Sequence, residues 1–85
     1  MKALVFEKRG LENLQFRDAE TPSLGSDDVL IKVRMAGVNP IDFRTVDSRP
    51  DVKPMPHIPG AEFAGIVDEV GGYVSTLEKG DRVIV

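Results

Sequence analysis

The chain has 85 residues, of which 41% are hydrophobic and 29% charged, and its formal net charge is −3. A chain of this length makes at most one small domain, and without Cys it has neither a disulfide nor a thiolate metal site of its own. Scattered cations, an acidic balance and the lack of a long apolar run predict a soluble, cytoplasmic protein that binds neither nucleic acid nor membrane.

Three strands are predicted in the first half of the chain. One covers residues 2–6, and a second, over residues 14–20, begins with apolar and polar residues in alternation. A loop rich in turn residues, 21–28, leads to the strongest candidate, 29–36. In this third strand the alternation separates Ile31, Val33 and Met35 on one face from Lys32 and Arg34 on the other.

A short helix is predicted directly after the third strand. Asn39 is a favoured N-cap residue, and Pro40 after it suits the first helical position. One or two helical turns are expected. The following residues, 48–59, carry four prolines and are expected to be irregular, which places His57 in a loop.

Two further strands are predicted at 63–70 and 82–85, with turns at 71–72 and 77–81. Short strands separated by Gly and Pro turns, without a repeat or a long amphipathic helix, predict a mainly β fold, either a small barrel or a sandwich. Because domains usually end in exposed segments, the apolar residues 83–85 suggest that this sequence is the front of something longer.

The segment from His57 to Gly71 holds the most informative pattern. Gly60, Gly65 and Gly71 follow each other at spacings of five and six residues. Glycine serves where the backbone adopts a shape that other residues cannot reach, or where another group approaches it closely. Glu62 lies at a joint between loop and strand, which is a common place for functional side chains.

Six segments in a fixed order carry a resemblance to a known family: 1–3, 28–33, 36–42, 59–67, 70–71 and 79–83. They resemble the N-terminal, GroES-like catalytic domain of the medium-chain dehydrogenase/reductase family, which includes zinc-type alcohol dehydrogenases and quinone oxidoreductases. The resemblance implies a GroES-like, partly open β-barrel with a short helix over residues 1–85. It also implies that this is the N-terminal part of a larger two-domain enzyme, with a Rossmann domain downstream.

Two positions bear on a catalytic zinc. In the zinc alcohol dehydrogenases of this family, a Cys follows the Gly-Val pair and a His follows the first Gly of the Gly-x-Glu motif, and both bind zinc. Here Asn39 and Ala61 stand at these places. An amide is a poor zinc ligand and a methyl group is none. The resemblance therefore implies no catalytic zinc and no metal ligand in this chain.

The pair Asn39-Pro40 looks like the quinone oxidoreductase and enoyl reductase branch. There the Asn lies at the hydride-transfer site, and residues around it contact the nicotinamide. This implies that Asn39 is catalytic and, with Pro40, binds the cofactor. An amide N–H suits this role because it stabilises negative charge on a carbonyl oxygen. The alternative is that Asn39 only caps the helix.

Three further residues lie at positions that have a counterpart in the family. Arg44 replaces a Tyr of some quinone reductases and is a second catalytic candidate, as a donor to a carbonyl or carboxylate; the alternative is a solvated Arg. Asp42 matches a residue that orients a zinc-bound His in zinc members. Because Ala61 stands in place of that His, Asp42 is instead expected to be an acidic residue at the helix start, where the helix dipole favours it. Glu62 is expected to be structural.

The remaining polar candidates are expected to be structural. His57 is interpreted as a loop residue rather than a proton relay, because the sequence shows no partner for it. Tyr73 is expected to be a partly packed turn residue. Asp81 and Arg82 are expected to pair within a turn that opens the last strand.

For function, the resemblance implies a part of a zinc-independent oxidoreductase that transfers hydride from NADPH or NADH to a quinone or conjugated carbonyl compound. The missing domain would bind most of the cofactor, and the full-length enzyme would be a homodimer or homotetramer. Two alternatives stay open: a zinc-containing alcohol dehydrogenase with ligands outside this segment, and a free-standing GroES-like interaction module.

Overall fold

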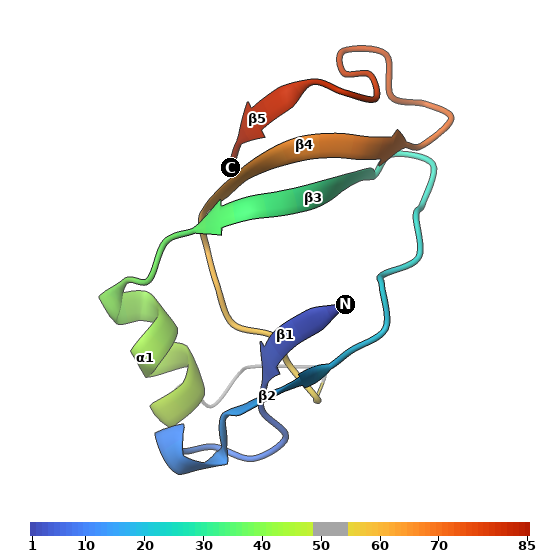
Figure 1. The fold of residues 1–85 in the computed structure, drawn as a ribbon. Coiled ribbons are helices and arrows are strands. Elements are labelled where there is room, and N and C mark those ends of the chain that lie inside the picture. Colours follow the sequence, from blue (N-terminus) through green and yellow to red (C-terminus); the bar gives the residue numbers. More distant parts are fainter. Residues whose placement is uncertain (49–54) are drawn as a thin grey trace. The chain divides into compact units, whose positions relative to one another are not determined.

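The computed structural model describes residues 1–48 and 55–85, which form five β-strands, one α-helix and one 3₁₀-helix (Figure 1). These residues divide into two compact units. The first unit is Met1–Thr21 with Val38–Ala61, and the second unit is Pro22–Gly37 with Glu62–Val85. In the described ranges, no helix is both long and apolar enough to span a membrane.

The first unit is built on an antiparallel hairpin. Strand β1 (Lys2–Val5) pairs with β2 (Gln15–Asp18), and the 3₁₀-helix η1 (Leu11–Asn13), which the sequence did not predict, lies between them. The helix α1 (Pro40–Asp47) contacts η1. The backbone N–H of Gly10 donates to the carbonyl of Val46 at 2.9 Å, so the hairpin connection is held against the helix.

Packing in the first unit centres on Phe6, which is 1% exposed, with Val5 and Val46 also buried. The His57 ring meets the Phe6 ring edge to face, with centroids 5.6 Å apart. The two residues also exchange backbone hydrogen bonds of 3.0 and 2.9 Å. His57 thus lies in the irregular segment, as predicted, but is fixed to the end of β1. Two of the four prolines of that segment, Pro50 and Pro54, fall outside the described residues.

The second unit is a three-stranded antiparallel sheet in the order β3-β4-β5. Strands β3 (Val29–Ala36) and β4 (Phe63–Val70) have the bounds that the sequence predicts, and β5 (Arg82–Ile84) ends one residue earlier than expected. The register between β3 and β4 shifts twice. One shift leaves Asp68 as an extra residue on β4, and the other leaves Arg34 as an extra residue on β3.

The burial of β3 differs from the sequence expectation. Ile31 is half-buried, but Val33 and Met35 are 52% and 76% exposed, so this side does not form a buried stripe. Two physical reasons account for the difference. The bulge at Arg34 interrupts the two-residue alternation, and a single sheet layer covers neither of its own faces.

The spaced glycines have both of the predicted roles, an unusual backbone conformation and a close approach of another group. Gly60 has a φ of 134°, a conformation that other residues rarely adopt. A Cβ on Gly65 would overlap the backbone carbonyl of Lys32, and a Cβ on Gly71 would overlap the carbonyls of Gly25 and Ser26. At these two positions glycine permits a close approach of main chain to main chain.

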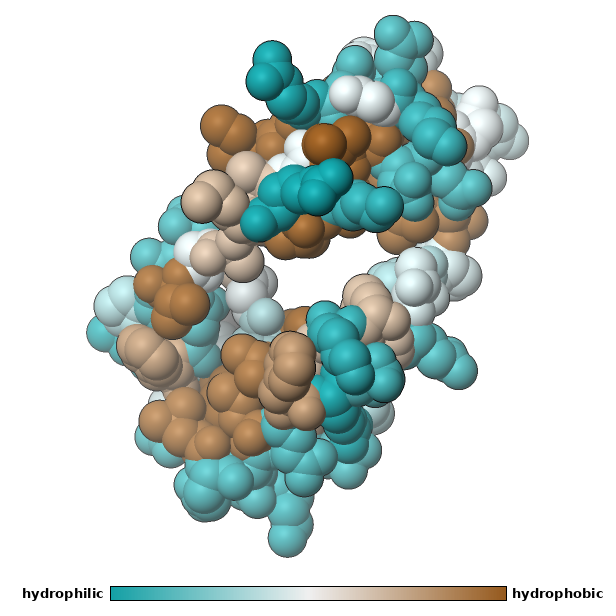
Figure 2. Space-filling view, in the orientation of Figure 1, coloured by the Kyte–Doolittle hydropathy of each residue, from teal (hydrophilic) through white to brown (hydrophobic). Residues whose placement is uncertain are grey.

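The fold class agrees with the prediction of a mainly β protein with one short helix. The described strands form one two-stranded and one three-stranded sheet, and neither sheet closes into a barrel. Apolar side chains reach the surface of both units, where Figure 2 shows them in brown among hydrophilic residues. The mainly β fold with one short helix is therefore confirmed, and the described strands form no closed barrel.

Candidate functional site

The first candidate site lies at the start of α1 in the first unit. Asn39 has an extended backbone, with φ −132° and ψ 164°, and precedes Pro40 at the first helical position. Asn39 and Asp42 form a capping box, in which each side chain accepts a hydrogen bond from the backbone N–H of the other residue. The Asp42 Oδ2 atom lies 2.8 Å from the Asn39 backbone nitrogen. Asp42 is therefore a residue of the helix start, as predicted.

The capping role of Asn39 leaves its proposed chemical role intact. A cap employs the side-chain carbonyl oxygen, because it must accept from a backbone N–H. A donor to a substrate oxygen employs the NH₂ group at the other end of the same amide. The two interpretations that the sequence left open for Asn39 thus use different atoms. The capping bond also fixes the direction of the amide plane.

Three apolar residues close to Asn39 in the sequence have exposed side chains. Val38 is 73%, Ile41 45% and Phe43 52% exposed, whereas Val46 alone is buried on α1. A signal was present in the sequence. Positions 41, 43 and 46 cannot all share one face of a helix with 3.6 residues per turn, so a short α1 had to expose some of them.

The helix brings only part of the predicted site together. Pro40 and Arg44 are four residues apart and share a face of α1. Asn39 is five residues before Arg44, a rotation of about 140° on an ideal helix. Arg44 is exposed, and its backbone carbonyl accepts from the Ser48 N–H at 2.9 Å. Asn39 and Arg44 are therefore not stacked on one helical face.

The second candidate region lies at one end of the sheet in the second unit. Glu62 precedes β4, and its carbonyl accepts from the Gly37 N–H at 3.1 Å, one step beyond the ladder pair of Ala36 and Phe63. A Cβ on Gly37 would lie 2.5 Å from Oε1 of Glu62, so the carboxylate lies close over this glycine. The backbone of Glu62 extends the β3–β4 ladder, as a structural role requires.

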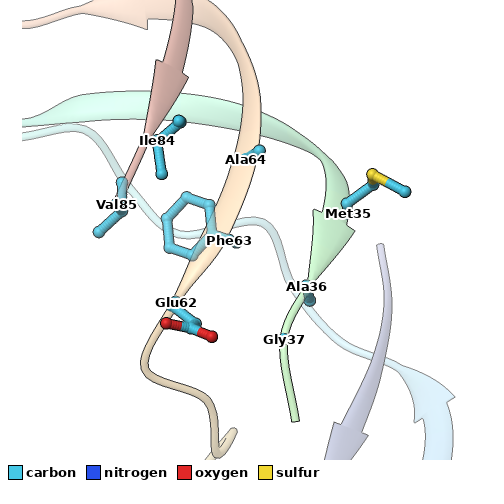
Figure 3. Close-up of a pocket in the computed structure, with 8 residues that line it drawn as sticks. All are labelled: Met35, Ala36, Gly37, Glu62, Phe63, Ala64, Ile84 and Val85. Carbon is cyan, nitrogen blue, oxygen red and sulfur yellow. The ribbon is translucent and has the colours of Figure 1, made fainter.

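An open pocket of about 400 Å³ lies beside Glu62 (Figure 3). Most of its lining is apolar, and the carboxylate of Glu62 is its one charged side chain. The residues that line it are Met35, Ala36, Gly37, Glu62, Phe63, Ala64, Ile84 and Val85. Phe63 and Val85 exchange backbone hydrogen bonds of 3.3 and 2.8 Å, which hold this end of the sheet together.

Two minor expectations from the sequence are wrong. Tyr73 was expected to pack partly, but it is 80% exposed and is held by its backbone, whose N–H donates to the Ser26 carbonyl at 2.9 Å. Asp81 was expected to pair with Arg82. Its carboxylate instead accepts from the Glu78 N–H at 3.0 Å, because a short acidic side chain readily bonds the backbone of its own turn.

The donor set does not fit a zinc centre built from these residues alone. Across residues 1–48 and 55–85, no three His, Cys, Asp or Glu side chains are grouped so that they could hold a metal ion. The sequence has no Cys and a single His, and that His packs on Phe6. A zinc centre with three such ligands would therefore need at least one ligand from outside the described residues.

Comparison with known proteins gives a consistent picture. Residues 25–85 match the model of the alcohol dehydrogenase GroES-like domain. The chain is 43% identical over 86 residues to a quinone oxidoreductase of Rattus norvegicus, which covers 98% of this chain and 26% of that protein. The structure of Escherichia coli quinone oxidoreductase complexed with NADPH is similar at a TM-score of 0.91 and 28% identity, over 99% of this chain and 26% of that one.

A thermostable alcohol dehydrogenase from Pyrobaculum aerophilum is also similar. Its structure matches with a TM-score of 0.94 and 50% identity, over 100% of this chain and 26% of that one. A second structure of that enzyme is described as cobalt and zinc bound. The present chain thus spans about a quarter of the length of the relatives that it matches.

Proposed function

Because the chain belongs to the alcohol dehydrogenase GroES-like domains of the medium-chain dehydrogenase/reductase family, we propose that it forms part of an oxidoreductase dependent on NADPH or NADH. Its substrate is a quinone or a conjugated carbonyl compound. The similarity to quinone oxidoreductases, one of them complexed with NADPH, supports this reaction class. The observation within the chain that carries the proposal is the oriented amide of Asn39 beside exposed apolar side chains.

When bound, the nicotinamide would supply hydride, and the role of Asn39 is to stabilise the oxygen that becomes negative. The NH₂ group of its amide donates to the substrate carbonyl oxygen, while the capping bond to Asp42 holds the amide in place. Pro40 contacts the cofactor, and its ring fixes the backbone next to the donor. Val38, which precedes Asn39, and Phe43, four residues after it, offer apolar surface to a ring-shaped substrate and exclude water from it.

Arg44 takes a secondary part in the proposal. Its exposed guanidinium lies on the same helical face as Pro40 and is suited to bind a carbonyl or carboxylate group of the substrate. Because it does not share a face with Asn39, it binds a different part of the substrate from the reacting oxygen.

We further propose the architecture that the resemblance implies. Residues 1–85 belong to a GroES-like catalytic domain, and a Rossmann domain further along the chain binds most of the cofactor. The full-length enzyme is a homodimer or homotetramer. Sequencing of the gene beyond Val85 tests this arrangement, because a strand followed by a Gly-rich turn and a helix is expected within the next ~200–250 residues.

Substitutions of Asn39 test the chemistry and separate it from the cap. Asn39→Asp keeps a favoured capping residue but removes the NH₂ donor, so we expect kcat to fall by well over about tenfold with little loss of stability. Asn39→Ala removes both, so it should lose activity to a similar degree and also lose about 1 kcal/mol of stability. Asp47→Asn, an exposed position at the other end of α1, is the control. Unchanged turnover in Asn39→Asp would remove Asn39 from the site.

Zinc independence is part of the proposal, supported by Asn39 and Ala61 at the positions of the family's ligands. One observation favours a second candidate, a metal-containing alcohol dehydrogenase: a relative that is 50% identical over this chain is described as cobalt and zinc bound. Metal analysis of the full-length protein distinguishes them. If the protein holds one zinc per chain and loses turnover on chelation, the metal-containing alcohol dehydrogenase is the correct candidate and the zinc-independent enzyme is not.

A further inference from the structure

The cross-strand register of the second unit gathers basic side chains on one face of the sheet. Ile66 on β4 lies opposite Lys32 on β3 and opposite Arg82 on β5, so these three side chains form a row on the same face. Arg34, the extra residue of the β3 bulge, lies near this row. Three cations from two strands therefore flank one central isoleucine.

An open groove of about 430 Å³ lies between the two arginines. Arg34 and Arg82 contribute its charged groups, and the rest of the lining is apolar side chain and strand backbone: Ala64, Gly65, Ile66, Val83 and Ile84. A volume of this size is within the usual range for small-molecule sites. Among the described residues, Ile84 is 88% exposed.

The cations of this groove have no acidic partner in the described residues. The ion pairs found there join Lys2 to Asp18 and Glu7 to Arg17, all in the first unit. Asp81, the acidic neighbour of Arg82 in the sequence, bonds the backbone of its own turn. Two guanidinium groups beside an apolar surface thus lack a local carboxylate, and each presents planar donors that match a carboxylate.

We propose that this groove binds a small amphiphilic anion, namely a carboxylate attached to a short apolar chain. The carboxylate lies between Arg34 and Arg82, with Lys32 adding to the positive potential, and the apolar chain covers Ile66 and Ile84. Charge complementarity selects an anion, and the apolar lining favours one with a hydrocarbon tail over a bare inorganic ion. The proposal uses residues of the second unit only and does not rest on the proposed function.

The test measures binding of octanoate to the full-length protein by isothermal titration calorimetry. Octanol shares the chain but lacks the charge, and acetate shares the charge but lacks the chain. We expect both to bind at least about tenfold more weakly than octanoate, because each lacks one half of the interaction. The proposal would be overturned if octanoate and octanol bound equally well, or if octanoate did not bind up to millimolar concentration. Binding of an Asp-rich peptide without binding of octanoate would also overturn it.

Variants locate the site. Arg34→Gln combined with Arg82→Gln should weaken octanoate binding by at least about tenfold, since charged hydrogen bonds are lost. Lys79→Gln removes an exposed cation of the same unit that does not line the groove, and it should leave the affinity unchanged. Circular dichroism of each variant checks folding. An equal loss of octanoate affinity in Lys79→Gln would show a general charge effect and would contradict binding at this groove.

Discussion

The two units of this chain depend on different kinds of contact. The first unit holds Val5, Phe6 and Val46, which are three of the four buried apolar residues found in the described ranges. The second unit holds the fourth, Val67, and relies on a three-stranded ladder with main chain packed against main chain at Gly65 and Gly71. The first unit should therefore be sensitive to lost side-chain volume, and the second to an added methyl group.

The largest effect is expected from Phe6→Ala in the first unit. Removing a fully buried ring costs about 3–5 kcal/mol and also removes the edge-to-face contact with His57. Phe16→Ala, at a ring that is 71% exposed, is the matched control and should cost less than about 1 kcal/mol. Urea denaturation of the full-length protein measures both. Similar losses of stability in the two variants would contradict the view that the first unit depends on buried side-chain volume.

A smaller loss, about 1–3 kcal/mol, is expected from Gly71→Ala in the second unit. The added Cβ would overlap the carbonyls of Gly25 and Ser26, which are main-chain groups and cannot rotate away. Gly72→Ala is a control one residue along, because no heavy atom lies within 4 Å of its added Cβ. Its stability should change by under about 0.5 kcal/mol. Hydrogen exchange of the β3 and β4 amides should report the loss in Gly71→Ala only.

The smallest effect is expected at the surface ion pair of the first unit. Lys2 Nζ lies 3.0 Å from Asp18 Oδ2, and the two side chains are 62% and 76% exposed. Such a pair contributes about 0.2–1 kcal/mol and weakens as salt is added. A double-mutant cycle of Lys2→Gln and Asp18→Asn measures the coupling. A coupling above about 2 kcal/mol would mean that charge, and not only packing, stabilises the first unit.

The sequence predicted the fold better than the burial. The bounds of β3 and β4 and the start of α1 follow from local signals, namely apolar runs between turns and an Asn-Pro pair. The exposure of Val33 and Met35 does not follow from local signals, because the type of an apolar residue does not show whether another layer covers it. The bulges were also not predictable, since they arise from pairing between distant residues.

For the candidate site, the sequence identified the polar residues and missed their surroundings. Asn39 and Asp42 were visible because capping depends on residues three apart. The exposure of Val38 was not predicted, since the residue type alone does not show whether an apolar side chain is covered. The closeness of Gly37 to the carboxylate of Glu62 was not predicted either, because only the fold brings these two residues together.

The two bulges have a consequence for how this sheet tolerates changes in length. One extra residue on β3 and one on β4 offset each other, so Val29 still meets Val70 at one end and Ala36 meets Phe63 at the other. Because neither extra residue has a partner across the ladder, losing Arg34 alone, or Asp68 alone, would remove one bulge and leave the remaining cross-strand pairs in place. Losing both would give a regular ladder with the same pairs. A deletion of one residue at either position is thus expected to keep the register of the sheet.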